Sequence, residues 1–494
     1  MIPRSLYHLS LTLFALTSTV ADAKAPLSYP TQDDWMVHTQ VIGEYWLQSD
    51  AYGTPPGRFP TFRCDNGRLP SPEALCQELV DVGAKDKLGQ RYTRMQSRQI
   101  YTYLALFHMT GDPTAFTMAT AGIQELLAMR QPEGGFALYV DANGQASDEP
   151  VSAQDAAYAL LGLAMYDYLT RDPAIHQILL SEIDALFARY YDTEVKALSW
   201  WPHATSRERN PRRELVAQLD QLTAYLNLVS TVSTPQEKIQ LNRYRQWVVQ
   251  VLIDQYVDLD QCRVFGALHH KYFMLPDHGH NDFGHAVKTW WNLILNRDLL
   301  TQTHQQQVQT CLGHTLNQAT RELPVAELLS YLPDTKHDKW VAAGALTTWK
   351  GYHYENYVNS WQWAELDQGL IIAKLVGEGP LQASLPSTTW QFLDAWVDPV
   401  DGGVGLNPQT NKQFDWLNGY HHTEHALFGL LATQTFYAQP VTLYFAFPSE
   451  QPSAFFPYLL GGQVVNITPL TLPNRRGSKV VFNSLHVTKE SVHD

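Results

Sequence analysis

A histidine-rich loop that runs into an amphipathic helix is the stretch of this sequence best suited to chemistry. The segment is HNDFGHAVKTWWNLI, residues 280–294. Asn281 or Asp282 can cap the helix, because a short polar side chain accepts hydrogen bonds from the first free backbone N–H groups. Polar side chains then follow at helical spacing on one face: His285, Lys288, Thr289 and Asn292. We expect this face to line a cavity, because other helices carry polar residues at the same level.

The starts of five other helices also carry polar or ionisable groups. The full set is Arg98, Asp155, Gln218 with Asp220, His285, Glu365, and His421 with His425. Taken singly, each has a plain structural explanation, such as an ion pair between Arg98 and Asp155 or a satisfied core histidine. Buried ionisable groups are costly, however, unless they are paired or used. Their recurrence at one structural level therefore indicates a common site.

Tryptophans accompany these polar residues, in or beside the long loops and the same helices. They are Trp200, Trp201, Trp291, Trp361, Trp363 and Trp416. Flat aromatic faces suit the C–H faces of a sugar, and we expect about half of these rings to be ordinary core instead. The combination predicts a cleft of carbohydrate size, with Trp361 and Trp416 against the substrate.

Two sequence patterns contain residues that could bind a metal ion. The residues His421, Glu424 and His425 match H-x-x-E-H, which binds zinc in one group of metallopeptidases. Histidines of the loop before 285 could also gather a metal: His269, His270, His278 and His280, with His285. The first pattern is short and lacks an evident third ligand, and loop histidines in a row are more often solvated. We therefore predict no metal and no cofactor.

Helical segments that alternate with two kinds of connection must position these residues. Short connections cap the next helix, as in TGDP (110–113), RDP (171–173) and STP (233–235). Longer connections, rich in glycine and aromatic residues, predict hairpins or extended loops at 131–140, 192–201, 258–268 and 398–406. The pattern recurs about every 67 residues, so residues 33–436 hold six helix-turn-helix units.

Six such units can stack as an open solenoid or close into a ring, and the helix compositions favour the ring. Helices before the short turns mix small and apolar residues with a few polar ones, and we expect them to form an inner wall: 94–109, 152–170, 214–231, 283–296, 359–376 and 420–434. The helices after the short turns carry more charge and should form the outer wall. All six inner helices then start at one mouth, where their polar residues converge.

The two ends of the chain differ from this pattern. Residues 1–23 combine Arg4, an apolar run and Ala21-Asp22-Ala23, which is typical of a secretory signal with its cleavage site. The barrel then spans 24–440, and short alternating strands in 441–494 predict a β-rich appendage. No later segment reaches the ~20 apolar residues of a membrane span. We therefore expect a soluble periplasmic or secreted protein.

Charge and cysteine content restrict the partners and the compartment. A formal net charge of -14 argues against nucleic acid or an anionic membrane as partner. Cys64 and Cys76 could bridge an irregular loop in an oxidising compartment, although reduced buried thiols are equally compatible with the sequence. The same alternatives stay open for Cys262 and Cys311. The sequence does not predict the oligomeric state.

Several motifs resemble the N-acylglucosamine 2-epimerase superfamily, which includes cellobiose 2-epimerases and isomerases of mannose-type sugars. The matching segments are RMQSRQIYTYLALFHMTGDP (94–113), QDAAYALLGLAMY (154–166), FGHAVKTWW (283–291), WQWAE (361–365) and DWLNGYHHTEHAL (415–427). The resemblance covers roughly residues 33–436 and leaves out the tail. It implies an all-α fold, an (α/α)6 barrel, in agreement with the repeat count.

The resemblance also implies roles for single residues. It makes His285 and His421 the two catalytic histidines and Arg98 the substrate-binding arginine. It places Glu365 at the family's inner-helix glutamate. Three positions depart from the family pattern: Lys288 stands where an acid is usual, Gln218 where a histidine is common, and Glu424 where an arginine is often found.

These features predict a sugar isomerase or 2-epimerase that acts on an aldose or on the reducing end of a short oligosaccharide. Removal of the C2 proton gives an enediolate, and two groups with pKa values of about 7 can complete either reaction. We predict that His285 is the base, because Lys288 one turn away should lower its pKa, and that His421 is the acid. Arg98 should stabilise the enediolate. The other substrate-binding residues that we expect are Asp155, Asp220, Lys288, Glu365, Trp361, Trp416 and His425.

Two other function classes remain open from the sequence. Asp155, Asp220 and Glu365 could supply the paired carboxylates of a glycoside hydrolase, and a histidine or tyrosine base could serve a polysaccharide lyase. A sugar-binding toroid without activity is the third class. In every case the expected partner is a small sugar.

Overall fold

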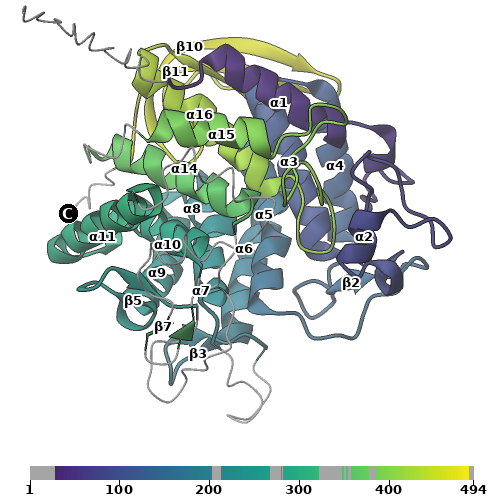
Figure 1. The fold of residues 1–494 in the computed structure, drawn as a ribbon, viewed down its shortest axis with the longest axis horizontal. Helices are drawn as coiled ribbons and strands as arrows, with labels where there is room; N and C mark the ends of the chain where they lie inside the picture. Colours follow the sequence, from purple (N-terminus) through teal and green to yellow (C-terminus); the bar gives the residue numbers. More distant parts are fainter. Residues whose placement is uncertain are drawn as a thin grey trace, which may run out of the picture.

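Helices dominate the structure (Figure 1), and their packing arranges them in an inner and an outer ring. The computed structural model describes residues 28–202, 213–266, 280, 282–321, 348–349, 352–353, 358–377 and 384–488. The predicted signal segment 1–23 lies outside these residues, as do Asn281, three of the loop histidines (His269, His270 and His278) and the last residues, 489–494. The fold is the predicted (α/α)6 barrel with a small C-terminal sheet.

The inner ring contains the six predicted inner helices, with bounds within a few residues of those expected. They are α3 (Thr93–Thr110), α5 (Ala153–Thr170), α7 (Leu215–Gln221) continued by the π-helical turn η3 (Leu222–Leu226) and α8 (Asn227–Val232), α10 (Phe283–Leu295), α14 (Ser360–Leu375) and α16 (Tyr420–Tyr437). The last of these, α16, packs against both α14 and α3. The ring is therefore closed and is not an open solenoid.

The outer ring covers the inner one. Its helices are α1 (Gln32–Trp46), α4 (Pro113–Leu127), α6 (Pro173–Tyr190), α9 (Pro235–Val251) with the π-helical turn η4 (Leu252–Tyr256), α11 (Gln302–Arg321) and α15 (Leu385–Ala395). Each packs on an inner helix, and α1 covers α16. Short elements fill the connections: η1 (Ser49–Ala51), α2 (Gln77–Asp81), η2 (Lys85–Lys87), η5 (Arg297–Leu299) and η7 (Pro452–Ala454).

The short turns act as the sequence predicts. Asp112 accepts a hydrogen bond from the backbone N–H of Thr114 at 2.7 Å and caps α4. Asp172 caps α6, and Thr234 forms a capping box with Glu237 at the start of α9. Each of these outer helices also begins with a proline, whose missing N–H needs no partner at that position.

The long loops form short antiparallel pairings before the inner helices. The pairs are β1 (Arg91–Tyr92) with β2 (Tyr139–Val140), β3 (Tyr191–Asp192) with β4 (Ala197–Leu198), β5 (Val257–Asp258) with β6 (Arg263–Val264), and β7 (Thr348–Trp349) with β8 (Tyr352–His353). The loop 131–140 thus pairs with the segment before α3 and not only with itself. These pairings hold the loops around the mouth where the inner helices begin.

The C-terminal sheet shares the core of the barrel. Its strands are β9 (Val441–Phe445), β10 (Gly461–Leu472) and β11 (Arg475–His486), in the antiparallel order β10-β11-β9. Figure 1 places the yellow strands near α16, and β9 packs on α3 and α16. The Phe445 ring lies 4.9 Å from the His108 ring, between centroids. The appendage therefore completes the barrel core and has no separate core of its own.

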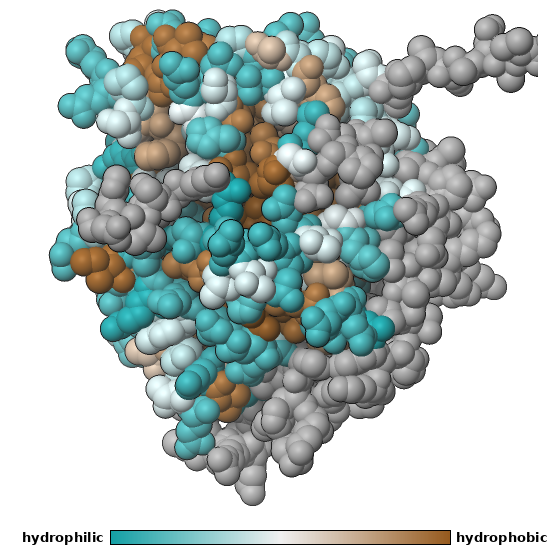
Figure 2. Space-filling view, turned by 90° about the vertical axis from the view of Figure 1, so that its left-hand side faces the viewer, coloured by the Kyte–Doolittle hydropathy of each residue, from teal (hydrophilic) through white to brown (hydrophobic). Residues whose placement is uncertain are grey.

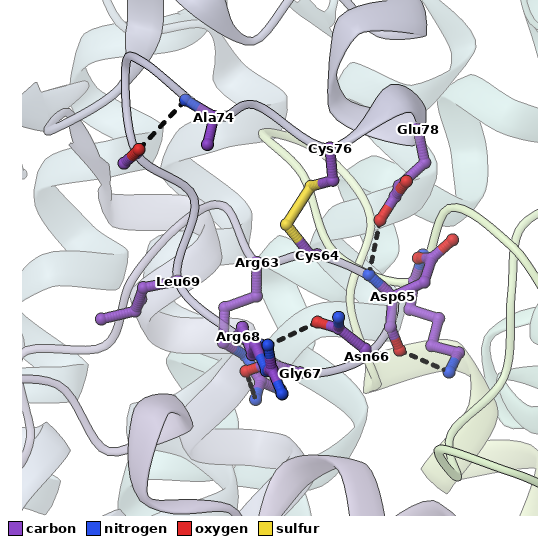
Figure 3. The surroundings of a disulfide bond; sticks show 12 residues. Arg63, Cys64, Asp65, Asn66, Gly67, Arg68, Leu69, Ala74, Cys76 and Glu78 are labelled. Carbon is purple, nitrogen blue, oxygen red and sulfur yellow. Dashed lines mark hydrogen bonds between the residues drawn. A yellow bond between two sulfur atoms is a disulfide. The ribbon is translucent and has the colours of Figure 1, made fainter.

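Both possible disulfides are formed. Cys64 pairs with Cys76 in the loop between α1 and α2 (Figure 3), where the Glu78 carboxylate also accepts the backbone N–H of Asp65 at 2.8 Å. Cys262 pairs with Cys311 and ties the β5–β6 hairpin to α11. The alternative of four reduced thiols is therefore wrong for this structure.

Large apolar side chains are few on the described surface. Figure 2 shows one face on which hydrophilic residues predominate around scattered hydrophobic patches. The exposed large apolar residues are Val37, Leu69, Val80, Ile239, Val400, Trp416 and Val465. Among the described helices, none is both long and apolar enough to cross a membrane.

Candidate active site

A cavity of about 500 Å³ opens at the mouth where the inner helices begin. Its ionisable lining residues in the described structure are Arg94, Arg98, His280, His285, Lys288 and His421. Aromatic faces complete the wall: Tyr158, Trp200, Trp361 and Trp416. Pockets of this volume hold small molecules, and this one has both polar groups and flat rings for a sugar.

The two predicted catalytic histidines both lie close to one tryptophan in this cavity. The centroid of the Trp361 ring lies 4.7 Å from that of His285 and 5.7 Å from that of His421. The imidazoles can therefore be no farther apart than the sum of these distances. His285 lies in the first turn of α10 and His421 in the first turn of α16. Two separate helices therefore place the histidines in the same cavity.

Asp282 orients His285. It is the N-cap of α10, and one carboxylate oxygen accepts the backbone N–H of His285 at 3.1 Å while the other binds its Nδ1. Burial raises the pKa of Asp282, but the His285 ring outweighs this effect and the net pKa is below the ordinary value. An ionised carboxylate can only accept, so Nδ1 carries the proton and Nε2 is left for a substrate.

Lys288 pairs with a carboxylate of a neighbouring inner helix. Its ammonium group donates a hydrogen bond to Asp220 at 2.8 Å, and both side chains are buried. Burial raises the pKa of Asp220, but Lys288 more than compensates and lowers it to about 2. The ion pair forms because α7 and α10 are neighbours in the ring, which the sequence spacing alone did not reveal. Asp220 thus lies behind Lys288 and does not line the cavity.

His421 is held in its neutral form. Burial is the largest cause that lowers its pKa well below the ordinary value, and the cations Arg98 and Lys288 add to it. Its Nδ1 lies 3.4 Å from a carboxyl oxygen of Glu365. The other oxygen of Glu365 accepts the indole N–H of Trp291 at 2.9 Å. Glu365 therefore contacts the histidine from behind the cavity wall and does not face a substrate directly.

Burial raises the pKa of Glu365 to about 8, although Lys288 opposes the shift. Glu424 adds to it as a second nearby carboxyl. At neutral pH Glu365 is accordingly a neutral acid, next to a neutral imidazole. A buried carboxyl in this state can hold a proton for a catalytic histidine.

Replacing Glu365 by glutamine should change stability in a pH-dependent way. The folded pKa of about 8 exceeds the unfolded value of about 4.3, so the carboxyl stabilises the fold fully below pH ~4.3 and loses this contribution as the pH rises toward 8. We expect Glu365→Gln to gain stability relative to the wild type between pH 5 and pH 9, measured by denaturant unfolding. The exposed Glu133→Gln is the control. A difference that does not depend on pH would contradict the neutral carboxyl.

Arg98 lies in the cavity wall without an ionic partner among the described residues. Its guanidinium stacks 3.8 Å from the centre of the Tyr158 ring, is 4% exposed, and donates to the backbone oxygen of Trp416. The Nε atom is buried with no hydrogen-bond partner. A cation in this position is available for an oxyanion of a bound ligand.

Asp155 and His425 lie outside the cavity lining, contrary to the prediction. Asp155 forms an ion pair with Arg94 at 2.5 Å, so the considered pairing with Arg98 is not formed. His425 lies one helical turn deeper than His421, where its Nε2 binds Asp367 at 2.8 Å and its ring packs against Phe392. Neither of these residues contacts the space available to a substrate.

The two histidines of the H-x-x-E-H pattern have different carboxyl partners, Glu365 for His421 and Asp367 for His425. A different group, Glu365, His421 and Glu424, has ligand atoms that all lie within 4.8 Å of one another. The second described group of this kind, Cys64, Cys76 and Glu78, contains the disulfide sulfurs. Thiolate coordination is therefore not available there.

Sequence reasoning missed several lining residues. They are Arg94, Gln154, Tyr158, Asn359, Leu406 and Leu417. Arg94 lies four residues before Arg98, and Tyr158 four after Gln154, so one-turn spacing on a helix was a signal that could have found both pairs. Of the predicted tryptophans, Trp200, Trp361 and Trp416 line the cavity, whereas Trp291 and Trp363 are buried in the wall.

Comparison with solved structures identifies the fold. No family model matches the chain, and no curated protein matches it in sequence. A cellobiose 2-epimerase from Spirochaeta thermophila superposes with a TM-score of 0.62 at 15% identity, over 82% of this chain and 96% of that one. The chain has the barrel fold of sugar epimerases.

Other solved structures share the same fold. A D-mannose isomerase gives a TM-score of 0.60 at 14% identity, over 83% of this chain and 100% of that one. A beta-1,3-1,4-glucanase from Paenibacillus gives 0.50 at 11% identity, over 83% and 94%. The fold expected from the resemblance is thus confirmed, and it includes both isomerases and a hydrolase. The reaction must be argued from the site.

Proposed function

We propose that this chain is a sugar isomerase or 2-epimerase that transfers a proton at C2 of an aldose, free or at the reducing end of a short oligosaccharide. The observation that carries the proposal is the placement of His285 and His421 in one cavity, each against the ring of Trp361. Cellobiose 2-epimerase and D-mannose isomerase on the same fold support it as analogies.

The chemistry requires one group to remove the C2 proton and another to return a proton. In the open-chain aldose this proton is acidic because C2 adjoins the carbonyl. Its removal leaves an enediolate, which gives the epimer when protonated on the other face of C2 and the ketose when protonated at C1. Histidine can serve as acid or base near neutral pH without a large change in pKa.

We assign the base to His285 and the acid to His421. The Asp282 carboxylate holds the proton of His285 on Nδ1, so Nε2 can accept the substrate proton, and the same carboxylate stabilises the imidazolium that forms. His421 can give its Nε2 proton to the enediolate while Nδ1 takes the proton of Glu365. Arg98 stabilises the enediolate oxygen, usually the largest contribution in such sites.

A retaining or inverting glycosidase is less well supported. Such enzymes need two carboxyl groups on opposite sides of the scissile bond. Among the described residues that line the cavity none is a carboxylic acid, because Asp155, Asp220 and Glu365 lie behind it in pairs with other groups. The glucanase neighbour therefore shares the fold without a matching arrangement in this cavity.

Export to an oxidising compartment is part of the proposal. Two disulfides close loops in the structure, and such bonds persist mainly in secreted or periplasmic proteins. The predicted signal at 1–23 is the sequence feature in agreement with this. Isolation of the protein from the periplasm or medium, with the mature chain beginning near residue 24, would test it.

Incubation with sugars in heavy water tests the reaction directly. We expect the wild type to place deuterium at C2 of the epimer, or at C1 of the ketose, for at least one member of a panel of aldoses and disaccharides. Proton NMR measures the exchange, and His285→Asn is the matched control. Cleavage of a glycosidic bond without deuterium exchange would contradict this proposal and indicate a hydrolase. Binding of a sugar without exchange or cleavage would indicate a binding protein.

A further inference from the structure

Three buried side-chain atoms converge behind His421 without any hydrogen-bond partner. They are Oε1 of Glu365, Nδ1 of His421 and Oε2 of Glu424. The first two of these atoms lie 3.4 Å apart, and each of the three side chains has one ligand atom within 4.8 Å of the others. The second oxygen of each carboxyl is anchored elsewhere, by Trp291 for Glu365 and by the Tyr458 hydroxyl at 2.7 Å for Glu424. Each carboxyl thus keeps one oxygen without a partner, and Glu424 is a neighbour of the proposed acid pair that the mechanism has not used.

Two carboxylates this close and fully buried cannot both be ionised beside a neutral imidazole. The charged and titratable groups that face them are Arg98 and Tyr101 of α3, Asp220 of α7, Lys288 of α10, Tyr420 of α16 and Tyr458. The nearest cation, Lys288, is bound to Asp220. The group must hold either one proton or a metal ion.

Tyr458 reaches this group from the C-terminal segment, outside the six hairpins. The Tyr101 hydroxyl donates to the Tyr458 hydroxyl at 2.8 Å, so the proton of Tyr458 is left for Glu424. Tyr168 accepts the backbone N–H of Tyr458 at 2.9 Å and fixes the segment. Burial raises the pKa of Glu424, and the hydrogen bond from Tyr458 opposes this rise. A donor that is itself hydrogen-bonded is a stronger donor, so the Tyr101–Tyr458 chain stabilises the negative charge on Glu424.

We propose that Glu424 and Tyr458 are positioning residues of the active site, which keep the single proton of the buried group on Glu365, next to His421. This rests on the proposed function. The anion on Glu424 disfavours a second anion on Glu365, so Glu365 retains its proton until His421 gives up its own. The proton then moves from Glu365 to Nδ1 of His421 as the Nε2 proton moves to the enediolate. The connection between β9 and β10 thus becomes part of the catalytic apparatus.

The pH profile of deuterium exchange tests this assignment. The wild type should lose activity as the pH rises and Glu365 ionises. Removing the neighbouring anion in Glu424→Gln should move this loss to lower pH by about one unit, the usual size of a like-charge effect at this distance. Tyr458→Phe should also move the loss of activity to lower pH, but by less than Glu424→Gln does. Glu424→Asp keeps a carboxylate at this position and should therefore retain most of the wild-type pH profile. Melting temperatures show which variants are folded.

Tyr103→Phe is the matched control for Tyr458→Phe. It also removes a buried tyrosine hydroxyl, but this one lies on α3 and donates to the backbone oxygen of Trp46, not to Glu424. Its profile should coincide with that of the wild type. If Glu424→Gln and Tyr458→Phe are both folded, catalyse deuterium exchange and have the pH profile of the wild type, the inference is overturned but the proposed function remains. Elemental analysis that finds about one equivalent of a divalent metal in the wild type and none in Glu424→Gln would also overturn it. Absence of exchange in the wild type would instead contradict the proposed function.

Discussion

Replacing His421 or His285 by asparagine should lower kcat for sugar isomerisation by at least ~100-fold, the usual contribution of a general acid or base. Asparagine keeps a polar side chain of similar size but cannot take up or release the proton. The two rings lie at the cavity and are 7% and 8% exposed, so their loss creates little unfilled space in the core. We therefore expect small changes in melting temperature. Initial rates and thermal unfolding of each variant measure the two effects separately.

His425→Asn is the matched control on the same helix. His425 is fully buried, is paired with Asp367, and does not line the cavity. Its replacement should lower the melting temperature, because Asp367 loses its buried partner, while the folded variant keeps kcat near the wild-type value. Near-full activity in both His285→Asn and His421→Asn would refute the proton-transfer mechanism.

Replacing Lys288 by methionine should destabilise the protein by about 3–5 kcal/mol, the usual effect of removing one partner of a buried ion pair. The substitution leaves the buried Asp220 carboxylate with two neutral side-chain donors, the Gln154 amide at 2.8 Å and the Thr223 hydroxyl at 3.4 Å, and without its cation. The double variant Lys288→Met, Asp220→Asn should recover most of this loss, because no uncompensated charge remains. Denaturant unfolding of the single and double variants gives both free energies.

The pH dependence of this effect has a defined sign. In the wild type the pKa of Asp220 is lowered to about 2, so its ion pair stabilises the fold above the unfolded value of about 3.9 and is lost as the pH falls through 2. In Lys288→Met the effect of burial on the pKa of Asp220 is no longer offset by Lys288, so Asp220 should become protonated at a higher pH. The difference in the free energy of unfolding between Lys288→Met and the wild type should therefore decrease as the pH falls. An equal gap at pH 4 and pH 8 would contradict the assignment.

The hairpins of the barrel could be predicted because their signals are local. Asp112, Asp172 and Thr234 cap helices through hydrogen bonds to residues two or three positions away. The repeat of about 67 residues and the small residues of the inner helices indicated the number and the layering of the hairpins. Polar residues in the first turns then located the mouth. Arg98, His285 and His421 line the cavity at that mouth, and their catalytic roles stay a prediction.

The partners of these residues could not be predicted, because they come from other hairpins. Lys288 and Asp220 are 68 positions apart, and His425 and Asp367 are 58 apart. The sequence placed Lys288 beside His285 and grouped His425 with His421, since it showed only which residues share a helix face. In the structure Lys288 and His425 each pair with a carboxylate from a neighbouring helix. Periodicity along one helix contains no information about such a partner.

The six hairpins and the mouth follow from capping and helical periodicity, which act over a few residues, and the two histidines from motifs on single helices. The contacts of Asp282 with His285, of Glu365 with His421 and of Tyr458 with Glu424 became visible only in the folded chain. In a closed ring each inner helix meets two others, and buried charges must find partners there. The pairing is therefore fixed by which helices are neighbours and how deeply each side chain is buried, and neither is a property of a local segment.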